Sequence, residues 1–155
     1  MTIHTVANNT RHGAEGGKRV TDTDASRLPV RAGEDPWSTA ELADVRSELE
    51  REVAELRAEI EEKDSELAEQ LSDAVSGAGD DVTDTSAKAY QREHDLALAY
   101  NTRESLVQSE RAIERINAGT YGECESCGQA IGKARLQAFP RATQCLGCKQ
   151  REERR

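Results

Sequence analysis

A heptad-like repeat of apolar residues runs through the first half of the chain. The repeat consists of Leu42, Leu49, Val53, Leu56, Ile60 and Leu67, with charged side chains around it. Successive members are seven, four, three, four and seven residues apart, which is the spacing of a and d positions in a coiled coil. The pattern therefore predicts one long helix with a narrow apolar seam. Lys63 and Gln70 occupy seam positions toward its far end, so we expect the packing to loosen there.

Local signals predict both ends of this helix. Ser38 followed three residues later by Glu41 forms a capping box, and Trp37 and Leu42 stand where a hydrophobic staple packs across a helix start. The Gly-Ala-Gly sequence at residues 77–79 favours a helix end just before it.

A second helix of similar length is predicted from about Thr85 to Ala118. One of its faces carries Ala99, Leu106, Ile113 and Ile116. The connection between the helices is short and holds three aspartates within residues 80–84. This arrangement favours an antiparallel coiled-coil hairpin over residues 36–118, with an acidic tip at 80–84. The alternative is that the helices zip with a second copy of the chain, but we expect a monomer.

Residues 1–35 lack a sustained apolar period of either 2 or 3.6 and contain several glycines. We predict that this segment is a disordered tail. His4 and His12 lie in it, and we interpret them as solvated side chains and not as metal ligands.

The composition indicates an elongated all-α protein. Of the 155 residues, 35% are hydrophobic and 3% aromatic, too few to fill a conventional core of that size. The net charge of -9 is uneven: residues 36–118 carry nine basic and twenty-one acidic side chains, and residues 119–155 carry seven basic and four acidic. An acidic hairpin argues against broad binding to a phosphate backbone. No run approaches the roughly 20 apolar residues of a membrane span, so we expect a soluble cytoplasmic protein without a membrane partner.

The four cysteines form two matched pairs near the C-terminus. Cys124 and Cys127 are separated from Cys145 and Cys148 by seventeen residues, within the range of the C-x2-C, x15 to x20, C-x2-C zinc pattern. We predict one zinc ion in a small module over residues 119–155. Four protein ligands leave no open position, so the zinc is expected to be structural.

The alternative for these cysteines is two disulfides, which would require an oxidising compartment. Gly128 and Gly147 are expected to supply backbone freedom for the turns around the metal. The module has few apolar residues, so its folding should depend on zinc. Residues 149–155 are predicted to form a short terminal helix.

Other chemistry is not supported by the sequence. A calcium loop beginning at Asp80 fails, because Thr85 stands where the turn glycine belongs and Gln91 where the bidentate glutamate belongs. The chain has no P-loop and no nucleophile elbow, and His94 is interpreted as a surface or seam residue. We therefore expect no enzymatic activity. Asp81 or Asp84 could simply cap the second helix.

The zinc segment resembles the DksA/TraR-type regulators of bacterial RNA polymerase. The resemblance rests on the run Tyr121–Gly128, on Ile131-Gly132, Arg135-Leu136, Ala138 and Pro140, and on Cys145–Lys149. It extends through the hairpin from about Asp35 to the C-terminus. It implies a C4 zinc module beside an antiparallel coiled coil that enters the secondary channel of the polymerase and brings acidic tip residues near the catalytic centre.

The resemblance also implies roles for individual residues. The family's tip motif is two aspartates three apart followed by an alanine, and Asp81 and Asp84 match the pair while Ser86 stands at the alanine position. Some members respond to the alarmone ppGpp through basic residues. Lys149 keeps one of these, but Gln108 and Phe139 replace two others, so we do not expect direct dependence on ppGpp.

The function predicted is that of a transcription regulator that binds RNA polymerase without sequence-specific DNA binding. Two other functions compete with it. One is a zinc-ribbon protein that binds nucleic acid through Lys133, Arg135, Arg141 and the basic C-terminus. The other is a structural coiled-coil adaptor, whose contacts would lie along the helix faces.

Overall fold

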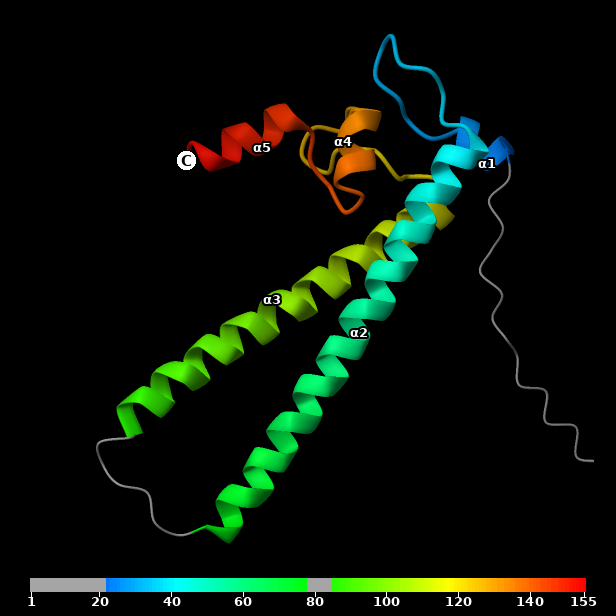
Figure 1. The fold of residues 1–155 in the computed structure, drawn as a ribbon. Coiled ribbons are helices and arrows are strands. Elements are labelled where there is room, and N and C mark those ends of the chain that lie inside the picture. Colours follow the sequence, from blue (N-terminus) through cyan, green and yellow to red (C-terminus); the bar gives the residue numbers. More distant parts are fainter. Residues whose placement is uncertain (1–21, 78–84) are drawn as a thin grey trace, which may run out of the picture.

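The computed structural model describes residues 22–77 and 85–155, which form five helices and no β-strand. The helices are α1 (Asp22–Ser26), α2 (Thr39–Ser76), α3 (Thr85–Ala118), α4 (Lys133–Ala138) and α5 (Leu146–Glu153). The long helices α2 and α3 run antiparallel as a hairpin; α1 and α4 lie at its base, and α5 extends from there to one side (Figure 1). The predicted fold class, a hairpin with a small C-terminal module, is therefore confirmed.

The capping signals set the ends of α2. The Ser38 hydroxyl accepts a hydrogen bond from the Glu41 N–H at 3.1 Å, and the Ser38 N–H donates to the Glu41 carboxylate at 2.9 Å. This reciprocal pair satisfies N–H groups that a helix start leaves without partners. At the other end the Gly77 N–H donates to the Asp73 carbonyl at 3.1 Å. The bounds of α2 and α3 agree with the sequence prediction.

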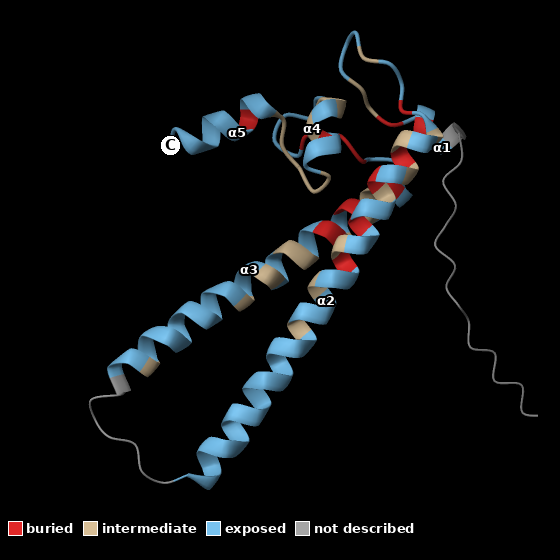
Figure 2. Cartoon of the chain, in the orientation of Figure 1, coloured by how far each residue is buried: buried red, intermediate tan, exposed pale blue. Residues whose placement is uncertain are grey.

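The predicted seam is buried only in the half of the hairpin next to its base (Figure 2). There α2 and α3 bury Leu42, Val45, Leu49, Val53, Ala112 and Ile116. Leu56 and Ile60 are half-buried, whereas Leu67, a predicted seam residue, is 51% exposed. The prediction of a seam reaching Leu67 is therefore wrong for its last member.

Toward the tip the two helices diverge (Figure 1), and polar side chains bridge them. The Thr102 hydroxyl donates to Glu59 at 3.2 Å, and the Arg103 guanidinium donates to Asp64 at 2.6 Å. Exposed ion pairs contribute only about 0–1 kcal/mol each. The two helices are therefore held together only weakly in the tip half of the hairpin.

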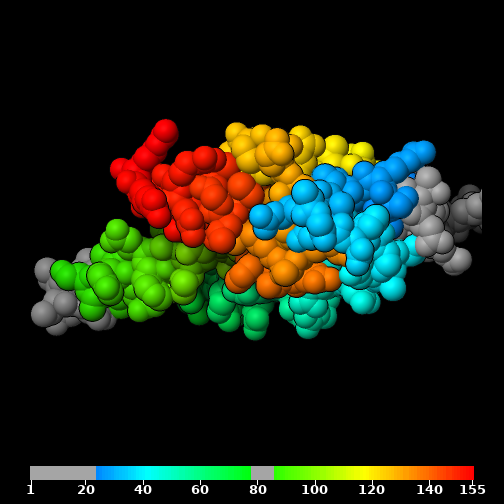
Figure 3. All heavy atoms as spheres, turned by 90° about the horizontal axis from the view of Figure 1, so that it is seen from above, coloured from blue at the N-terminus to red at the C-terminus, as the bar shows by residue number. Residues whose placement is uncertain are grey.

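The N-terminal boundary predicted at residue 35 is wrong, because residues 22–35 belong to the fold. Ala25 and Leu28 are buried in the same core as the hairpin base. The Glu34 carboxylate accepts a hydrogen bond from the Lys133 N–H of α4 at 3.3 Å. We call residues 22–37 the strap, which lies against the C-terminal module in Figure 3. The tail prediction for residues 1–21 lies outside the described residues.

Among the described residues, no helix combines the length and the apolar character needed to cross a bilayer.

The uneven burial of the seam predicts unequal effects of two matched substitutions. Leu49→Ala should lower the free energy of unfolding by about 2–5 kcal/mol, because Leu49 is fully buried and its removal leaves a cavity. Leu67→Ala, at a seam position of the same helix, should change it by less than about 0.5 kcal/mol. Urea unfolding followed by circular dichroism measures both. Equal losses would contradict the description of the tip half as lightly packed.

Candidate metal centre

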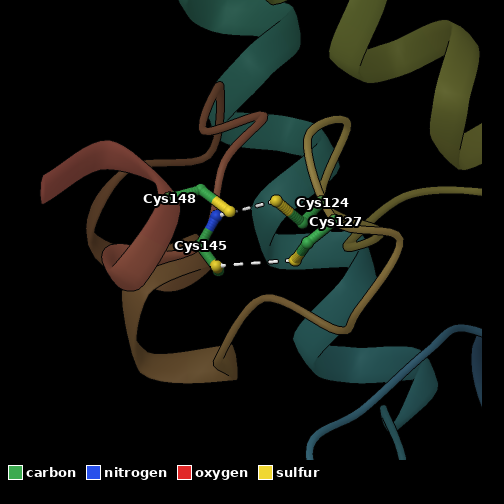
Figure 4. Close-up of side chains that lie close together, drawn as sticks. All are labelled: Cys124, Cys127, Cys145 and Cys148. Atoms are coloured by element: carbon green, nitrogen blue, oxygen red, sulfur yellow. Dashed lines mark hydrogen bonds between the residues drawn. The ribbon is translucent and has the colours of Figure 1, made fainter. Parts of the chain in front are cut away.

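The four cysteines converge beside the base of the hairpin. Cys124 and Cys127 lie in the turn that follows α3, Cys145 is the N-cap of α5, and Cys148 lies in the first turn of α5. Their four sulfur atoms all lie within 4.8 Å of one another (Figure 4). The prediction that these residues share one site is supported by this geometry.

A tight turn presents the first pair. The Cys124 N–H donates to the Gln129 carbonyl at 2.8 Å, and the Gly128 N–H donates back to the Cys124 carbonyl at 2.8 Å. Gly128 has a φ of 70°, a backbone conformation that residues other than glycine rarely adopt. Gly147, in contrast, lies within α5 and needs no positive φ, so the expectation of special backbone freedom there is wrong.

The sulfur spacing fits zinc and does not fit a disulfide. The sulfurs of Cys127 and Cys145 are 3.9 Å apart. A tetrahedral ion with Zn–S bonds of about 2.3 Å places its ligand sulfurs about 3.8 Å apart. Disulfide sulfurs are only about 2.05 Å apart, and all four thiols are free. Four thiolate ligands close the coordination sphere, so the ion has a structural role.

The local hydrogen bonds prepare some of these thiols for metal binding. Burial acts to raise the pKa of Cys124, but N–H groups of Cys145, Cys127 and Ser126 outweigh it and lower the pKa to about 6. The Cys148 N–H lowers the pKa of Cys145. Burial raises the pKa of Cys148 to about 11. Because zinc binds thiolates, metal binding must displace the proton from Cys148.

Both hairpin helices hold the module by charged contacts. From α3, Arg111 pairs with Glu125 at 2.8 Å, and the Arg115 guanidinium donates to the Glu123 carbonyl. From α2, Glu52 lies 3.6 Å from Arg141. The first ligand pair is therefore attached to α3, while the segment before the second pair contacts α2.

Lys133 of α4 makes a third attachment, which joins the module to both α2 and the strap. The Lys133 ammonium lies 2.8 Å from the Glu41 carboxylate and 5.1 Å from the centre of the Trp37 ring. Trp37 packs in turn against Tyr121, with ring centroids 6.1 Å apart. These contacts join the strap, α2 and the module, and sequence reasoning missed them. The apolar Leu28-Pro29-Val30 run before Trp37 was a signal that could have indicated an ordered strap.

The remaining residues singled out from the sequence are distributed over the molecule. Asp81 and Asp84 lie outside the described residues. Ser86 is exposed in the first turn of α3, and Gln108 and Phe139 are exposed on α3 and directly after α4. Lys149 is exposed on α5, 3.7 Å from Glu152.

Comparisons with known proteins give the same class for the module and the fold. Residues 119–154 match the family model of the prokaryotic dksA/traR C4-type zinc finger. The chain is 35% identical over 75 residues to the RNA polymerase-binding transcription factor DksA of Caulobacter vibrioides, covering 48% of this chain and 53% of that protein. It is 36% identical over 63 residues to the protein of the same name from Escherichia coli, covering 39% and 42%.

A solved structure extends the likeness beyond the module. The transcription factor DksA2 from Pseudomonas aeruginosa matches with a TM-score of 0.60 and 32% identity, over 74% of this chain and 84% of that one. A helical hairpin carrying a C4 zinc module is thus the class of protein to which the fold and site correspond. The chain belongs to the DksA/TraR family. It spans about half the length of the curated relatives that it matches.

Proposed function

We propose that the protein is a transcription regulator that binds bacterial RNA polymerase and inserts the tip of its hairpin into the secondary channel. The observation that carries the proposal is the match to DksA2 over 84% of that structure at 32% identity. Relatives that bear the name of an RNA polymerase-binding transcription factor support the same partner.

The shape of the hairpin suits this role. The 38 residues of α2 give it a length of about 57 Å. The tip-side ends of α2 and α3 lie far from the zinc module (Figure 1). In the proposed complex the base and the module dock on the outside of the polymerase. The connection that holds Asp81 and Asp84 then reaches the catalytic centre and alters promoter-complex stability.

The zinc-ribbon alternative is disfavoured by how the module uses its basic residues. The Lys133 ammonium contacts Glu41, and the Arg135 guanidinium donates to the Gln144 carbonyl at 3.1 Å. Arg141 lies near Glu52. A nucleic-acid surface would need these cations to face phosphates, whereas here they hold the protein together. The proposal therefore contains no sequence-specific DNA binding. The absence of enzymatic activity and the absence of direct dependence on ppGpp stay predictions from the sequence.

A binding experiment with purified components tests the proposal. The chain, immobilised through its N-terminus, should retain core RNA polymerase in a pull-down and should not retain a short DNA duplex at physiological salt. Duplex binding with a steep salt dependence in the absence of polymerase would instead favour the zinc-ribbon function. Failure to retain polymerase at micromolar concentrations would overturn the proposal.

Light scattering of the free chain should give the mass of a monomer.

A further inference from the structure

The sulfur atoms of Cys124 and Cys145 accept hydrogen bonds from backbone N–H groups, whereas the sulfur of Cys148 accepts one from a side chain. The sulfur of Cys124 accepts from the Cys145 N–H at 3.3 Å, a bond drawn in Figure 4. The N–H groups of Cys127 and Ser126 also face this sulfur, and the Cys148 N–H faces the sulfur of Cys145. The N–H groups of Ser126, Cys127 and Cys148 come from the turn after the first cysteine of each pair, and the N–H of Cys145 reaches Cys124 from the opposite pair. They are part of the loop geometry and need no particular side chain.

Cys148 is in a different position because it lies inside a helix. The Lys149 N–H is already used within α5, where it donates to the Cys145 carbonyl at 3.0 Å. Helix geometry directs backbone N–H groups along the axis toward earlier carbonyls, away from side chains. The donor that reaches the sulfur of Cys148 is instead a side chain, the Arg151 guanidinium, at 2.9 Å. Residues three apart on a helix lie on the same face, so α5 itself aims Arg151 at the ligand.

We propose that Arg151 is a positioning residue of the zinc site, which slows metal release by holding and neutralising the Cys148 thiolate. One zinc and four thiolates carry a net charge of -2. Cys148 is only 6% exposed, so water reaches its sulfur poorly and little solvation offsets that charge. The guanidinium supplies both a positive charge and an N–H donor at this sulfur. A thiolate held in this way dissociates from the metal less readily and is less open to attack by a proton or a competing ligand.

Zinc release to an excess of a chromophoric chelator tests the inference on the full-length, zinc-loaded protein. Arg151→Met keeps much of the side-chain bulk and removes the donor and the charge. Loss of an outer-sphere partner of a metal ligand typically costs 10–100-fold in metal affinity, and we expect release to be faster by about that factor. Arg154→Met is the matched control, since it removes the same charge one turn further along, at the C-cap of α5. It should change the rate by less than about twofold.

Cobalt substitution separates a direct hydrogen bond from a general loosening of α5. A hydrogen bond to a thiolate lowers the energy of its lone pairs, so removing the bond should move the sulfur-to-cobalt charge-transfer band to longer wavelength. The shift is expected in Arg151→Met and not in Arg154→Met. Arg151→Lys, which keeps a cationic donor, should restore part of both effects and gives a reading even where the Met variant holds metal poorly. Wild-type release with an unshifted band in Arg151→Met, or equal effects in the two Met variants, would overturn the inference.

Discussion

A Cys124→Ser variant is expected to lose zinc and to unfold residues 119–155. The module buries few apolar side chains of its own, chiefly Tyr121, Ile131 and Leu136. Structural zinc contributes about 10–16 kcal/mol of apparent binding free energy in small zinc-finger peptides, comparable to the whole stability of a typical domain. Metal analysis after gel filtration should therefore find no stoichiometric zinc in the variant.

The structure extends this expectation to the base of the hairpin. The buried residues of the module belong to one cluster with Trp37, Leu42, Val45, Leu49 and Ile116. Unfolding the module would expose one side of that cluster. Hydrogen exchange should accelerate at residues 39–53 and 109–118 as well as within the module.

A substitution next to the ligands provides the control. Ser126 lies between the first two cysteines, is exposed, and accepts a hydrogen bond from Gln144 at 3.1 Å. Ser126→Ala should keep full zinc content and unchanged exchange at the hairpin base. Retention of one zinc per chain by Cys124→Ser would contradict the four-cysteine site. Unchanged exchange at residues 39–53 in a metal-free variant would contradict the shared core.

This shared core could not be predicted from the sequence. The heptad spacing predicts a hairpin with its own apolar seam, and it does not indicate that this seam packs against the cysteine segment. The Lys133–Glu34 and Lys133–Glu41 contacts join residues 99 and 92 positions apart, and no local pattern encodes such pairs. The strap was missed for a related reason. Its buried residues, Ala25, Leu28 and Trp37, are too few and too irregularly spaced to produce a recognisable period.

Local signals, in contrast, predicted the long helices well. A capping box, a glycine stop and a short acidic connection depend on residues within a few positions of one another. The cysteine pairs predicted the metal site for the same reason, because a C-x2-C turn is a local structure that needs only one partner turn. The terminal helix begins at Leu146 and not at Lys149, because Cys145 acts as its N-cap while serving as a ligand.

The seam beyond Ile60 shows the limit of periodicity. Leu67 keeps the heptad spacing, but Lys63 and Gln70 stand on either side of it in the seam. On α3 the same face continues from Ala99 to polar residues at 92 and 88. Leu67 thus stands among polar seam positions and is 51% exposed, so apolar packing holds this half of the hairpin together only weakly. The exposed Leu71, Leu96, Leu98 and Tyr100 lie in this half as well.

Changing Asp81 and Asp84 together to Asn is expected to abolish regulation of transcription while leaving polymerase binding intact. In the proposed complex these two carboxylates act near the catalytic centre, and the isosteric change removes both negative charges. The docking contacts lie on the hairpin base and the zinc module, where the variant is identical to the original chain. Promoter-complex lifetime and transcript yield in a purified system measure regulation, and a pull-down with core polymerase measures binding in parallel.

Two comparisons decide whether the charges act in this way. If the aspartates only cap α3, the double Asn variant should be nearly silent, since Asn caps as well as Asp and only a dipole contribution of about 0.3–1 kcal/mol is lost. A shortened hairpin lacking residues 63–76 and 85–98 should reproduce the loss of regulation, because removing fourteen residues from each helix withdraws the tip by about 21 Å. This deletion keeps the Glu59–Thr102 pair and every buried residue of the base. Full regulation by the double Asn variant would leave the aspartates as helix caps, and full regulation by the shortened hairpin would place the active contacts along the helix faces, as in a structural adaptor.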